Sequence, residues 1–222
     1  MKLHQLRPAR SSRSGYTLTE ISISAIVMTV LFGAVAMAML RANGAYQQDV
    51  TTSTVNTQAQ RLLERIASEF LDAGHGSISI LPVAPNHESW IDYRRPNGFA
   101  GTAVTFGPTR RLVLRYSATD SDNGIDDNSN GLVDECTVSL VPDVLGDPTN
   151  EIALGSGVRE YLEGELPNAA DDNGNGLTDE RGLCATYDAT SSTLTLRLTI
   201  ERVGPGGERQ ASTAQTSIRL RN

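Results

Sequence analysis

The sequence has 222 residues and a formal net charge of −7 at pH 7, which leaves room for one soluble domain besides an N-terminal anchor and stalk. Its only lysine is Lys2 and its basic residues form no cluster, so the composition argues against nucleic-acid binding and favours cationic partners such as calcium. Aromatic residues make up 5% of the chain, so platforms for stacking sugars are scarce.

A short basic leader precedes a long apolar segment. Residues 1–15 contain Lys2 and three arginines but no acid, and an apolar run follows over residues 21–40. About twenty helical residues, at ~1.5 Å each, cross the ~30 Å of hydrocarbon in a bilayer. Positive charge before such a run keeps that end in the cytoplasm, and a general secretory signal would have a shorter apolar region. The sequence therefore predicts a single-pass anchor over residues 16–40, with the rest of the chain facing outward.

Three residues at the junction of leader and anchor follow a recognisable order. Gly15 ends the leader, the aromatic Tyr16 follows, and Glu20 is the fifth residue of a chain that begins at Tyr16. This order resembles the N-terminus of the type IV prepilin family, which includes the pseudopilins of type II secretion. The resemblance covers about residues 10–45. It implies cleavage after Gly15 by a prepilin peptidase, N-methylation of Tyr16, and pairing of Glu20 with the N-terminal amine of a neighbouring subunit.

The anchor also departs from the usual family pattern, and Glu20 has a second interpretation. A carboxylate in a membrane helix is costly unless it is paired or near the interface, so the alternative is that Glu20 snorkels into the headgroup zone. Tyr16 stands where Phe is usual in the family, and Thr19 and Ser22 occupy positions that are usually aliphatic. These departures favour a minor pilin or a pseudopilin over a major subunit.

The helical pattern continues beyond the anchor. Residues 41–73 contain no proline, and their apolar residues recur at spacings of three and four, which predicts an amphipathic stalk helix. Gly74 and Gly76 then end a single helix that runs from about Thr17 to Ala73. The apolar residues of the stalk face are Val50, Val55, Ala59, Leu62, Leu63, Ile66, Phe70 and Leu71.

From residue 77 onward, alternation of apolar and polar residues predicts β-strands. The clearest pair is a hairpin in which residues 192–203 and 210–220 flank a glycine-rich turn. The other predicted strands are 77–83, 89–93, 102–106, 111–116, 136–141 and 158–162, with a turn at 155–157. The fold class is therefore predicted as α+β, with the long N-terminal helix packed on an antiparallel β-sheet head over residues 77–222. The stalk sequence 58–70 and the last strand also resemble those of J-type pseudopilins and related minor pilins.

Two copies of an acidic sequence lie in the head, 45 residues apart. Residues 126–135 and 171–180 share the form D-D-N-x-N-G-L-x-D-E. Oxygen-bearing side chains at positions one, three and five, followed by Gly at six, are what an EF-hand-like calcium loop needs. Asp at position nine closes the ligand shell in the thrombospondin-type calcium repeats that the pattern resembles, whereas Glu at position ten comes too early for the twelfth-position ligand of an EF-hand. We expect the two acidic loops to span residues 120–135 and 168–180.

The pattern predicts calcium ligands at positions one, three, five, seven and nine, the seventh through its backbone carbonyl. The predicted ligands are Asp126, Asn128, Asn130, Leu132 and Asp134 in the first copy and Asp171, Asn173, Asn175, Leu177 and Asp179 in the second. Asp120 and Asp122, just before the first copy, are further candidates. Two Asn ligands lower the ligand charge, so we expect a structural ion of millimolar to sub-millimolar affinity. The alternative is that these residues only build solvated surface turns.

The two cysteines, Cys136 and Cys184, each follow one of the acidic copies. An outward-facing domain lies in an oxidising compartment, where two cysteines of one domain tend to form a disulfide. We expect this disulfide to tie the exits of both loops to one side of the sheet. The alternative is two free, buried thiols.

No pattern of catalytic residues stands out in the chain. His4 lies in the leader, and His75 and His87 lack ligand-like spacing to an acid or a cysteine. The sequence contains no G-x-S-x-G, no phosphate-binding glycine loop and no zinc-ligand spacing. The sequence therefore predicts a protein without enzymatic activity.

The leading interpretation is a pilin-like structural subunit, a minor pilin or a pseudopilin of a type IV pilus or type II secretion filament. Its N-terminus would face the cytoplasm from the inner membrane, and its calcium-stabilised head would be periplasmic or extracellular. Its partners would be other pilin subunits and the prepilin peptidase. One alternative is a single-pass calcium-binding surface or adhesion protein that does not enter a filament, and another is a secreted enzyme with metal-stiffened loops.

Overall fold

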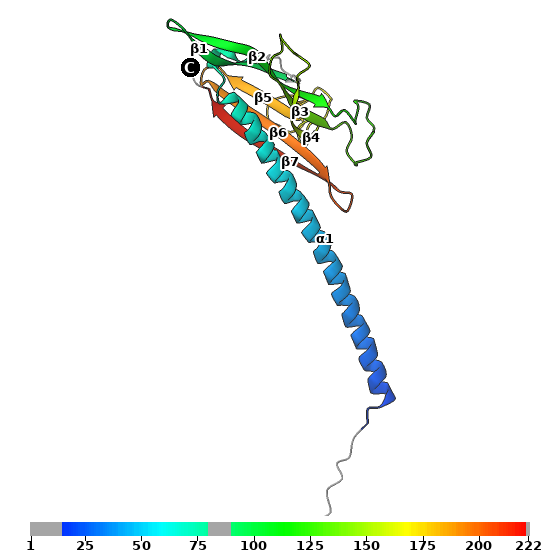
Figure 1. The fold of residues 1–222 in the computed structure, drawn as a ribbon. Coiled ribbons are helices and arrows are strands. Elements are labelled where there is room, and N and C mark those ends of the chain that lie inside the picture. Colours follow the sequence, from blue (N-terminus) through cyan, green and yellow to red (C-terminus); the bar gives the residue numbers. More distant parts are fainter. Residues whose placement is uncertain (1–14, 80–89, 221–222) are drawn as a thin grey trace, which may run out of the picture. The chain divides into compact units, whose positions relative to one another are not determined.

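The computed structural model describes residues 15–79 and 90–220 (Figure 1). The expected leader, apart from Gly15, lies outside these residues, as do His87 and parts of the expected strands 77–83 and 89–93. The chain divides into two compact units, one that ends at Ala45 and one that begins at Tyr46. Each unit is described by itself below.

Helix α1 (Leu18–Phe70) begins with a capping box. The Thr17 N–H donates to Glu20 Oε2 at 2.8 Å, and the Glu20 N–H donates back to Thr17 Oγ1 at 3.3 Å. The Thr17 hydroxyl donates a further bond to the same carboxylate oxygen at 2.9 Å. Because a first helical turn has N–H groups without helical partners, this reciprocal pairing explains why the helix begins here.

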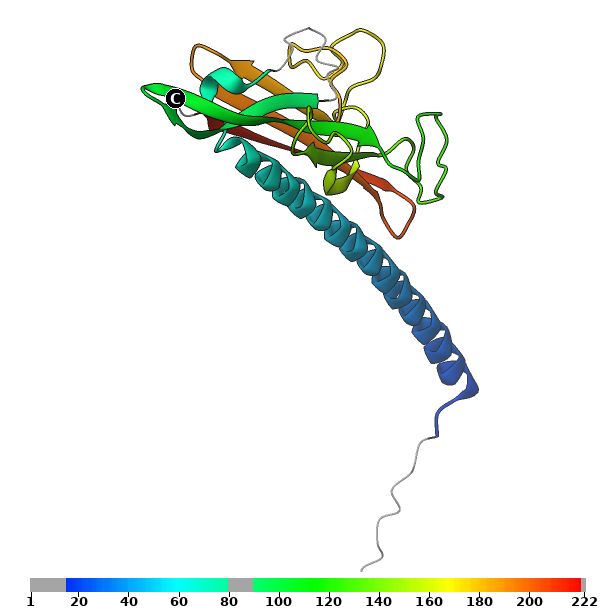
Figure 2. The same ribbon diagram turned by 45° about the horizontal axis from the view of Figure 1, so that its top comes forward.

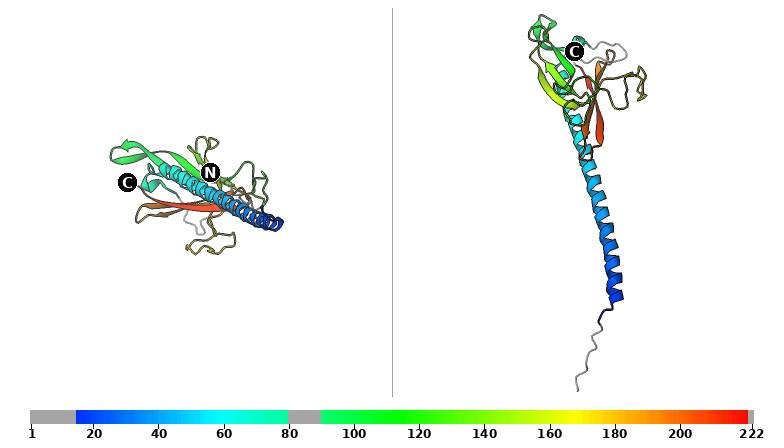
Figure 3. Two further views of the ribbon diagram at one scale, coloured as in Figure 1. Left: turned by 90° about the horizontal axis from the view of Figure 1, so that it is seen from below. Right: turned by 90° about the vertical axis from the view of Figure 1, so that its right-hand side faces the viewer.

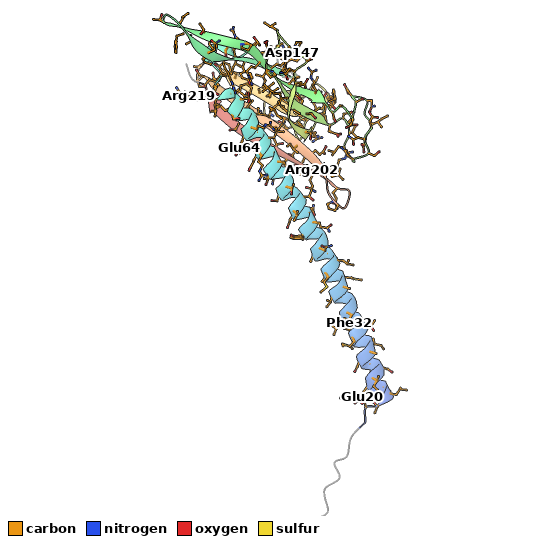
Figure 4. All side chains as sticks on the ribbon, in the orientation of Figure 1. Glu20, Phe32, Glu64, Asp147, Arg202 and Arg219 are labelled. Atoms are coloured by element: carbon orange, nitrogen blue, oxygen red, sulfur yellow. The ribbon has the colours of Figure 1, made fainter. Side chains whose placement is uncertain are left out.

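The part of α1 that lies in the first unit has exposed apolar side chains. All its residues from Leu18 to Leu40 are exposed, and Figure 4 labels one of them, Phe32. The helix is long enough and apolar enough to cross a membrane. A helix of this kind near an N-terminus serves as a single-pass membrane anchor or as a signal sequence.

From Tyr46 onward, α1 packs on the sheet through one face. The buried residues of this face are Val55, Ala59, Leu62, Leu63, Ile66 and Phe70. These residues confirm the expected stalk pattern, whereas Val50 and Leu71 are exposed. Leu71 lies beyond the helix, which ends at Phe70 and so is three residues shorter than expected.

The strands of the described head form one curled antiparallel sheet (Figure 2). The short 3-10 helix η1 (His75–Ser77) precedes the strands β1 (Trp90–Ala100), β2 (Ala103–Tyr116), β3 (Cys136–Val141), β4 (Ile152–Val158), β5 (Leu183–Asp188), β6 (Thr193–Val203) and β7 (Arg209–Arg219). Strands β1 to β4 pair in chain order, and β6 pairs with both β5 and β7. The two groups join where Val158 of β4 pairs with Ile200 of β6.

The hydrophobic core lies where the stalk part of α1 runs between these two groups of strands (Figure 3). Phe70 packs against Tyr93 of β1, with ring centroids 4.7 Å apart. On the other side, Leu194, Leu196 and Leu198 of β6 are fully buried. Because each large apolar side chain contributes about 1.5–3 kcal/mol on burial, this helix–sheet contact is the main stabilising interaction of the head. The α+β class is confirmed.

Several strands differ from the sequence-based expectation, although β3 and the β6–β7 hairpin match it closely. The expected strands 102–106 and 111–116 form one strand, β2, and β5 was not expected. The expected turn at 155–157 lies inside β4. A Cβ on Gly155 would lie 2.8 Å from the Leu62 side chain, so glycine at this strand position lets α1 approach the backbone.

Candidate metal sites in the acidic loops

The two acidic repeats form two loops of the same conformation. The first acidic loop (Asp120–Glu135) connects β2 to β3, and the second acidic loop (Glu165–Glu180) lies between β4 and β5; Figure 2 shows them as separate loops that leave the sheet. Positive φ angles occur at the same four positions in both loops. They are Gly124, Ser129, Gly131 and Asp134 in the first loop and Ala169, Gly174, Gly176 and Asp179 in the second.

The structural repeat is longer than the sequence motif suggested. Asp120 and Glu165 lie six residues before the first aspartate of each copy, and Asn123 and Asn168 lie three residues before it. Each asparagine side chain donates to the second aspartate of its copy: Asn123 Nδ2 to Asp127 Oδ2 and Asn168 Nδ2 to Asp172 Oδ2, both at 2.8 Å. The sequence reasoning missed Glu165 and both asparagines, although the 45-residue offset continues through them.

Asp120 closes the first loop from its buried start. It is fully buried, its Oδ1 accepts the Asp127 N–H at 2.8 Å, and its Oδ2 accepts the Glu135 N–H at 3.1 Å. The Glu135 carboxyl and these backbone donors lower the pKa of Asp120. Both oxygens of Asp120 therefore hold the two ends of the loop together, which makes Asp120 a scaffold residue. Asp122, the other upstream candidate, is exposed.

Glu165 performs the same task in the second loop. Only 1% of its surface is exposed. Its Oε1 accepts the Asn173 N–H and its Oε2 accepts the Asp179 N–H, both at 3.0 Å. An acid at this position therefore fixes the start of the loop to its end in both copies.

Positions one, three and five of the first loop lie around one tight turn. Asp126 accepts the N–H groups of Asn130 (3.1 Å) and Gly131 (2.7 Å) through its two oxygens. Asn128 Oδ1 accepts the Asn130 N–H at 3.0 Å, and Asn130 Oδ1 accepts the Leu132 N–H at 2.8 Å. These bonds bring the side chains of the first three predicted ligands together.

The second loop repeats this arrangement. Asp171 Oδ2 accepts the Gly176 N–H at 2.8 Å and Asp171 Oδ1 accepts the Asn175 N–H at 3.1 Å. Asn173 Oδ1 accepts the Asn175 N–H at 3.0 Å, and Asn175 Oδ1 accepts the Leu177 N–H at 2.9 Å. Leu132 is buried and Leu177 is half-buried at the corresponding seventh positions.

The aspartates at position nine face the preceding turn. Asp134 accepts the N–H groups of Asn123 and Gly124 at 3.0–3.1 Å. Asp179 accepts the N–H groups of Asn168 (3.1 Å) and Ala169 (2.9 Å). Both aspartates are buried. The structure therefore places the ninth predicted ligand at a different turn from the first, third and fifth.

The glutamates at position ten face the first three predicted ligands. Glu135 Oε1 accepts the side-chain N–H groups of Asn128 and Asn130, both at 2.7 Å, and Glu180 Oε1 accepts that of Asn175 at 2.6 Å. Glu135 is 8% exposed and Glu180 is 0% exposed. In both residues Oε2 is buried and has no hydrogen-bond partner among the described residues. Burial, and then the neighbouring Asp120 carboxylate, raises the pKa of Glu135.

A cluster around Arg181 joins the bases of the two loops. Arg181 follows the second loop, and its Nη1 donates to Glu160 Oε1 at 2.8 Å and to the hydroxyl of Tyr116, which precedes the first loop, at 3.2 Å. Its guanidinium also lies over the rings of Tyr116 and Tyr161, at 5.3 and 5.2 Å. This Arg181 clamp joins the exit of the second loop to the residues that precede each loop, by an ion pair with Glu160 and a hydrogen bond to Tyr116.

The expected disulfide is absent, and this is a correction. Cys136 and Cys184 are both free and buried. Cys136 lies on β3 opposite Val158 of β4, whereas Cys184 lies on β5 opposite Arg197 of β6, so the two cysteines are on strands that do not pair with each other. Burial raises the pKa of both thiols to about 12.

Among residues 15–79 and 90–220, no group of three or more His, Cys, Asp or Glu side chains is arranged to hold a metal ion. The first, third and fifth positions of each acidic loop contribute only one carboxylate, because the other two are Asn. No family model, curated protein or solved structure matches the chain.

Proposed function

We propose that the chain is a pilin-like structural subunit, a minor pilin or a pseudopilin of a type IV pilus or type II secretion filament. The proposal includes cleavage after Gly15 by a prepilin peptidase and N-methylation of Tyr16. The observation that carries it is the position of Glu20, which lies in the first turn of a long, exposed apolar helix (Figure 4). This helix begins at Leu18, two residues after Tyr16.

The chemistry of the anchor supports assembly through neighbouring subunits. Exposed apolar side chains such as Phe32, which is 67% exposed, require lipid or other apolar helices around them. Glu20 is the one acid among the apolar residues of this segment, and its described hydrogen bonds come from Thr17. Cleavage after Gly15 creates a cationic amine at Tyr16, and the amine of a neighbouring subunit is then a suitable partner for the Glu20 carboxylate.

Calcium is the proposed structural ion of the head. The fit rests on the two buried carboxylate oxygens without hydrogen-bond partners, one in each acidic loop. Oxygen-rich turns built from Asp and Asn match the ligand preference of calcium. A bound ion would supply positive charge to these loops, while Asp120 and Glu165 hold the loop backbones in place.

The first test is the intact mass and N-terminal sequence of the protein recovered from its native membrane. A chain that starts at N-methylated Tyr16 is the expected result. A chain that starts at Met1, or that is cut after Leu40, would contradict prepilin processing.

Assembly is tested separately by copurification of the processed protein with a filament. Glu20→Ala is expected to be processed but to be lost from the filament, because the inter-subunit partner of the amine is missing. Glu20→Ala also removes the capping box, so Thr17→Ala is the matched variant: it breaks the cap and keeps the carboxylate. Equal loss in both variants would mean that Glu20 acts only as a cap. Filaments that never contain the wild-type protein would favour the non-assembling surface protein.

A further inference from the structure

In each acidic loop of the described chain, one buried glutamate oxygen lacks a hydrogen-bond partner. Glu135 Oε2 and Glu180 Oε2 are buried and have no hydrogen-bond partner among the described residues. Native structures rarely leave a buried carboxylate oxygen in this state, because it has lost water and gained nothing in its place. Since the two loops occupy different places in the fold and have different charges nearby, the repeated lack of a partner indicates a property of the loop itself.

The surroundings of Glu135 contain acceptors rather than further donors. The side-chain N–H groups of Asn128 and Asn130 already donate to Oε1. The neighbouring Asp120 carboxylate has both oxygens on backbone N–H groups and is itself an acceptor. The group that would satisfy several oxygens at once is a hard cation with oxygen ligands.

We propose that Glu135 and Glu180, at position ten of each repeat, are the second carboxylate ligand of each cation site. Each would act with the residues at positions one, three and five of its own loop. This inference rests on the proposed calcium binding by the loops and changes the expected ligand set. Asp134 and Asp179, at position nine, become positioning residues.

The contacts of the position-nine aspartates support this exchange of roles. Asp134 accepts N–H groups from Asn123 and Gly124, before the repeat, whereas Asp126 accepts N–H groups from Asn130 and Gly131, within the turn of positions three and five. The backbone of Asp134 has a φ of 53° and that of Asp179 has a φ of 50°, in the left-handed region. This turn separates position nine from position ten and sends the two side chains to different neighbours.

The experiment is a calcium titration of the full-length protein in detergent, by calorimetry with calcium chloride as the only ligand. The test variant is Glu135→Gln/Glu180→Gln, which keeps side-chain size and Oε1 but removes the charge. The matched control is Asp134→Asn/Asp179→Asn, which removes the same charge from the adjacent position. Thermal unfolding without calcium checks that both variants are folded.

Wild type is expected to bind two calcium ions. The Glu→Gln double variant is expected to lose affinity by about tenfold or more at each site, and the Asp→Asn variant to lose less, because it removes a positioning group and not a ligand. Unchanged affinity in the Glu→Gln variant would overturn this inference and leave the proposed calcium binding intact. Wild-type protein that takes up no calcium would overturn both. A control that loses more affinity than the test variant would return the ligand role to position nine.

Discussion

The first and second acidic loops have the same pattern of positive φ angles, but the charges around their buried glutamates differ. In the second loop, Arg197 Nη1 lies 3.9 Å from Glu180 Oε1 and supplies a countercharge from β6. In the first loop, the carboxyl group of Asp120 adjoins Glu135, so like charges meet. The same loop conformation therefore accommodates a glutamate beside an arginine, in the second loop, and a glutamate beside an aspartate, in the first. The proposed cation would therefore neutralise more uncompensated negative charge in the first loop than in the second.

The largest effect is expected where the two loops are alike. Asp120→Ala and Glu165→Ala each remove a buried carboxylate that accepts two backbone N–H groups. Each change is expected to lower the free energy of unfolding by about 2–4 kcal/mol, because one buried and one partly buried backbone donor lose their partner. Urea unfolding of the full-length protein, followed through Trp90 fluorescence, measures this. Asp122→Ala, at an exposed position, is the control and should change stability by less than about 0.5 kcal/mol. A large effect in only one loop would show that the scaffold is not shared.

The next effect separates the loops in the absence of calcium. Glu135→Gln removes the repulsion with Asp120, so we expect it to raise the free energy of unfolding by about 1–2 kcal/mol. Glu180→Gln also removes a buried charge but loses the attraction of Arg197, so its net effect should be close to zero. Unfolding of both single variants in the presence of a calcium chelator makes the comparison. The same stabilisation in both variants would mean that Arg197 is too distant to matter.

A smaller effect concerns calcium affinity in the second loop. In protein carrying Glu135→Gln, Arg197→Met is expected to raise the affinity of the remaining site about fivefold, since a neighbouring positive charge opposes cation binding. Calorimetric calcium titration measures the change. Arg202→Met on the same strand is the control, because Arg202 is exposed. Lower affinity after Arg197→Met would show that Arg197 supports the site structurally.

The smallest effect comes from one additional amide in the first loop. Asn128 Nδ2 donates to Glu135, whereas in the described second loop Asn175 is the asparagine that donates to Glu180. Asn128→Ala is therefore expected to cost about 1 kcal/mol more unfolding free energy than Asn173→Ala, since a bond to a charged group is lost. Urea unfolding of the two variants measures the difference. Equal losses of unfolding free energy would show that the bond from Asn128 to Glu135 does not distinguish the loops.

Much of the fold follows from local sequence patterns, and the exceptions have long-range causes. The spacing of the stalk residues predicted the buried face of α1, and strict alternation predicted the β6–β7 hairpin. Strand β4 was read as a turn at 155–157, because glycines there signal a turn locally. Pairing with β3, in which Gly155 lies opposite Val138, makes this segment a strand, and the approach of Leu62 requires glycine there. Such a contact joins residues distant in the chain, so periodicity does not reveal it.

The candidate sites were also predictable in part. The repeat indicated which residues gather in each loop, and the structure does bring positions one, three and five together. The resemblance to thrombospondin-type calcium repeats placed the second carboxylate ligand at position nine. The proposed change to position ten depends on the left-handed backbone at Asp134 and Asp179, which aspartate adopts too rarely for the sequence alone to signal it.

The hydrogen bonds between Thr17 and Glu20 give the anchor a resting state. In the proposed pilin-like subunit, the first helical turn would solvate the Glu20 carboxylate before assembly, because Thr17 donates two hydrogen bonds to it. Entry into the proposed filament would then exchange these internal donors for the amine of the next subunit. The carboxylate would therefore have a hydrogen-bond partner both before and after assembly.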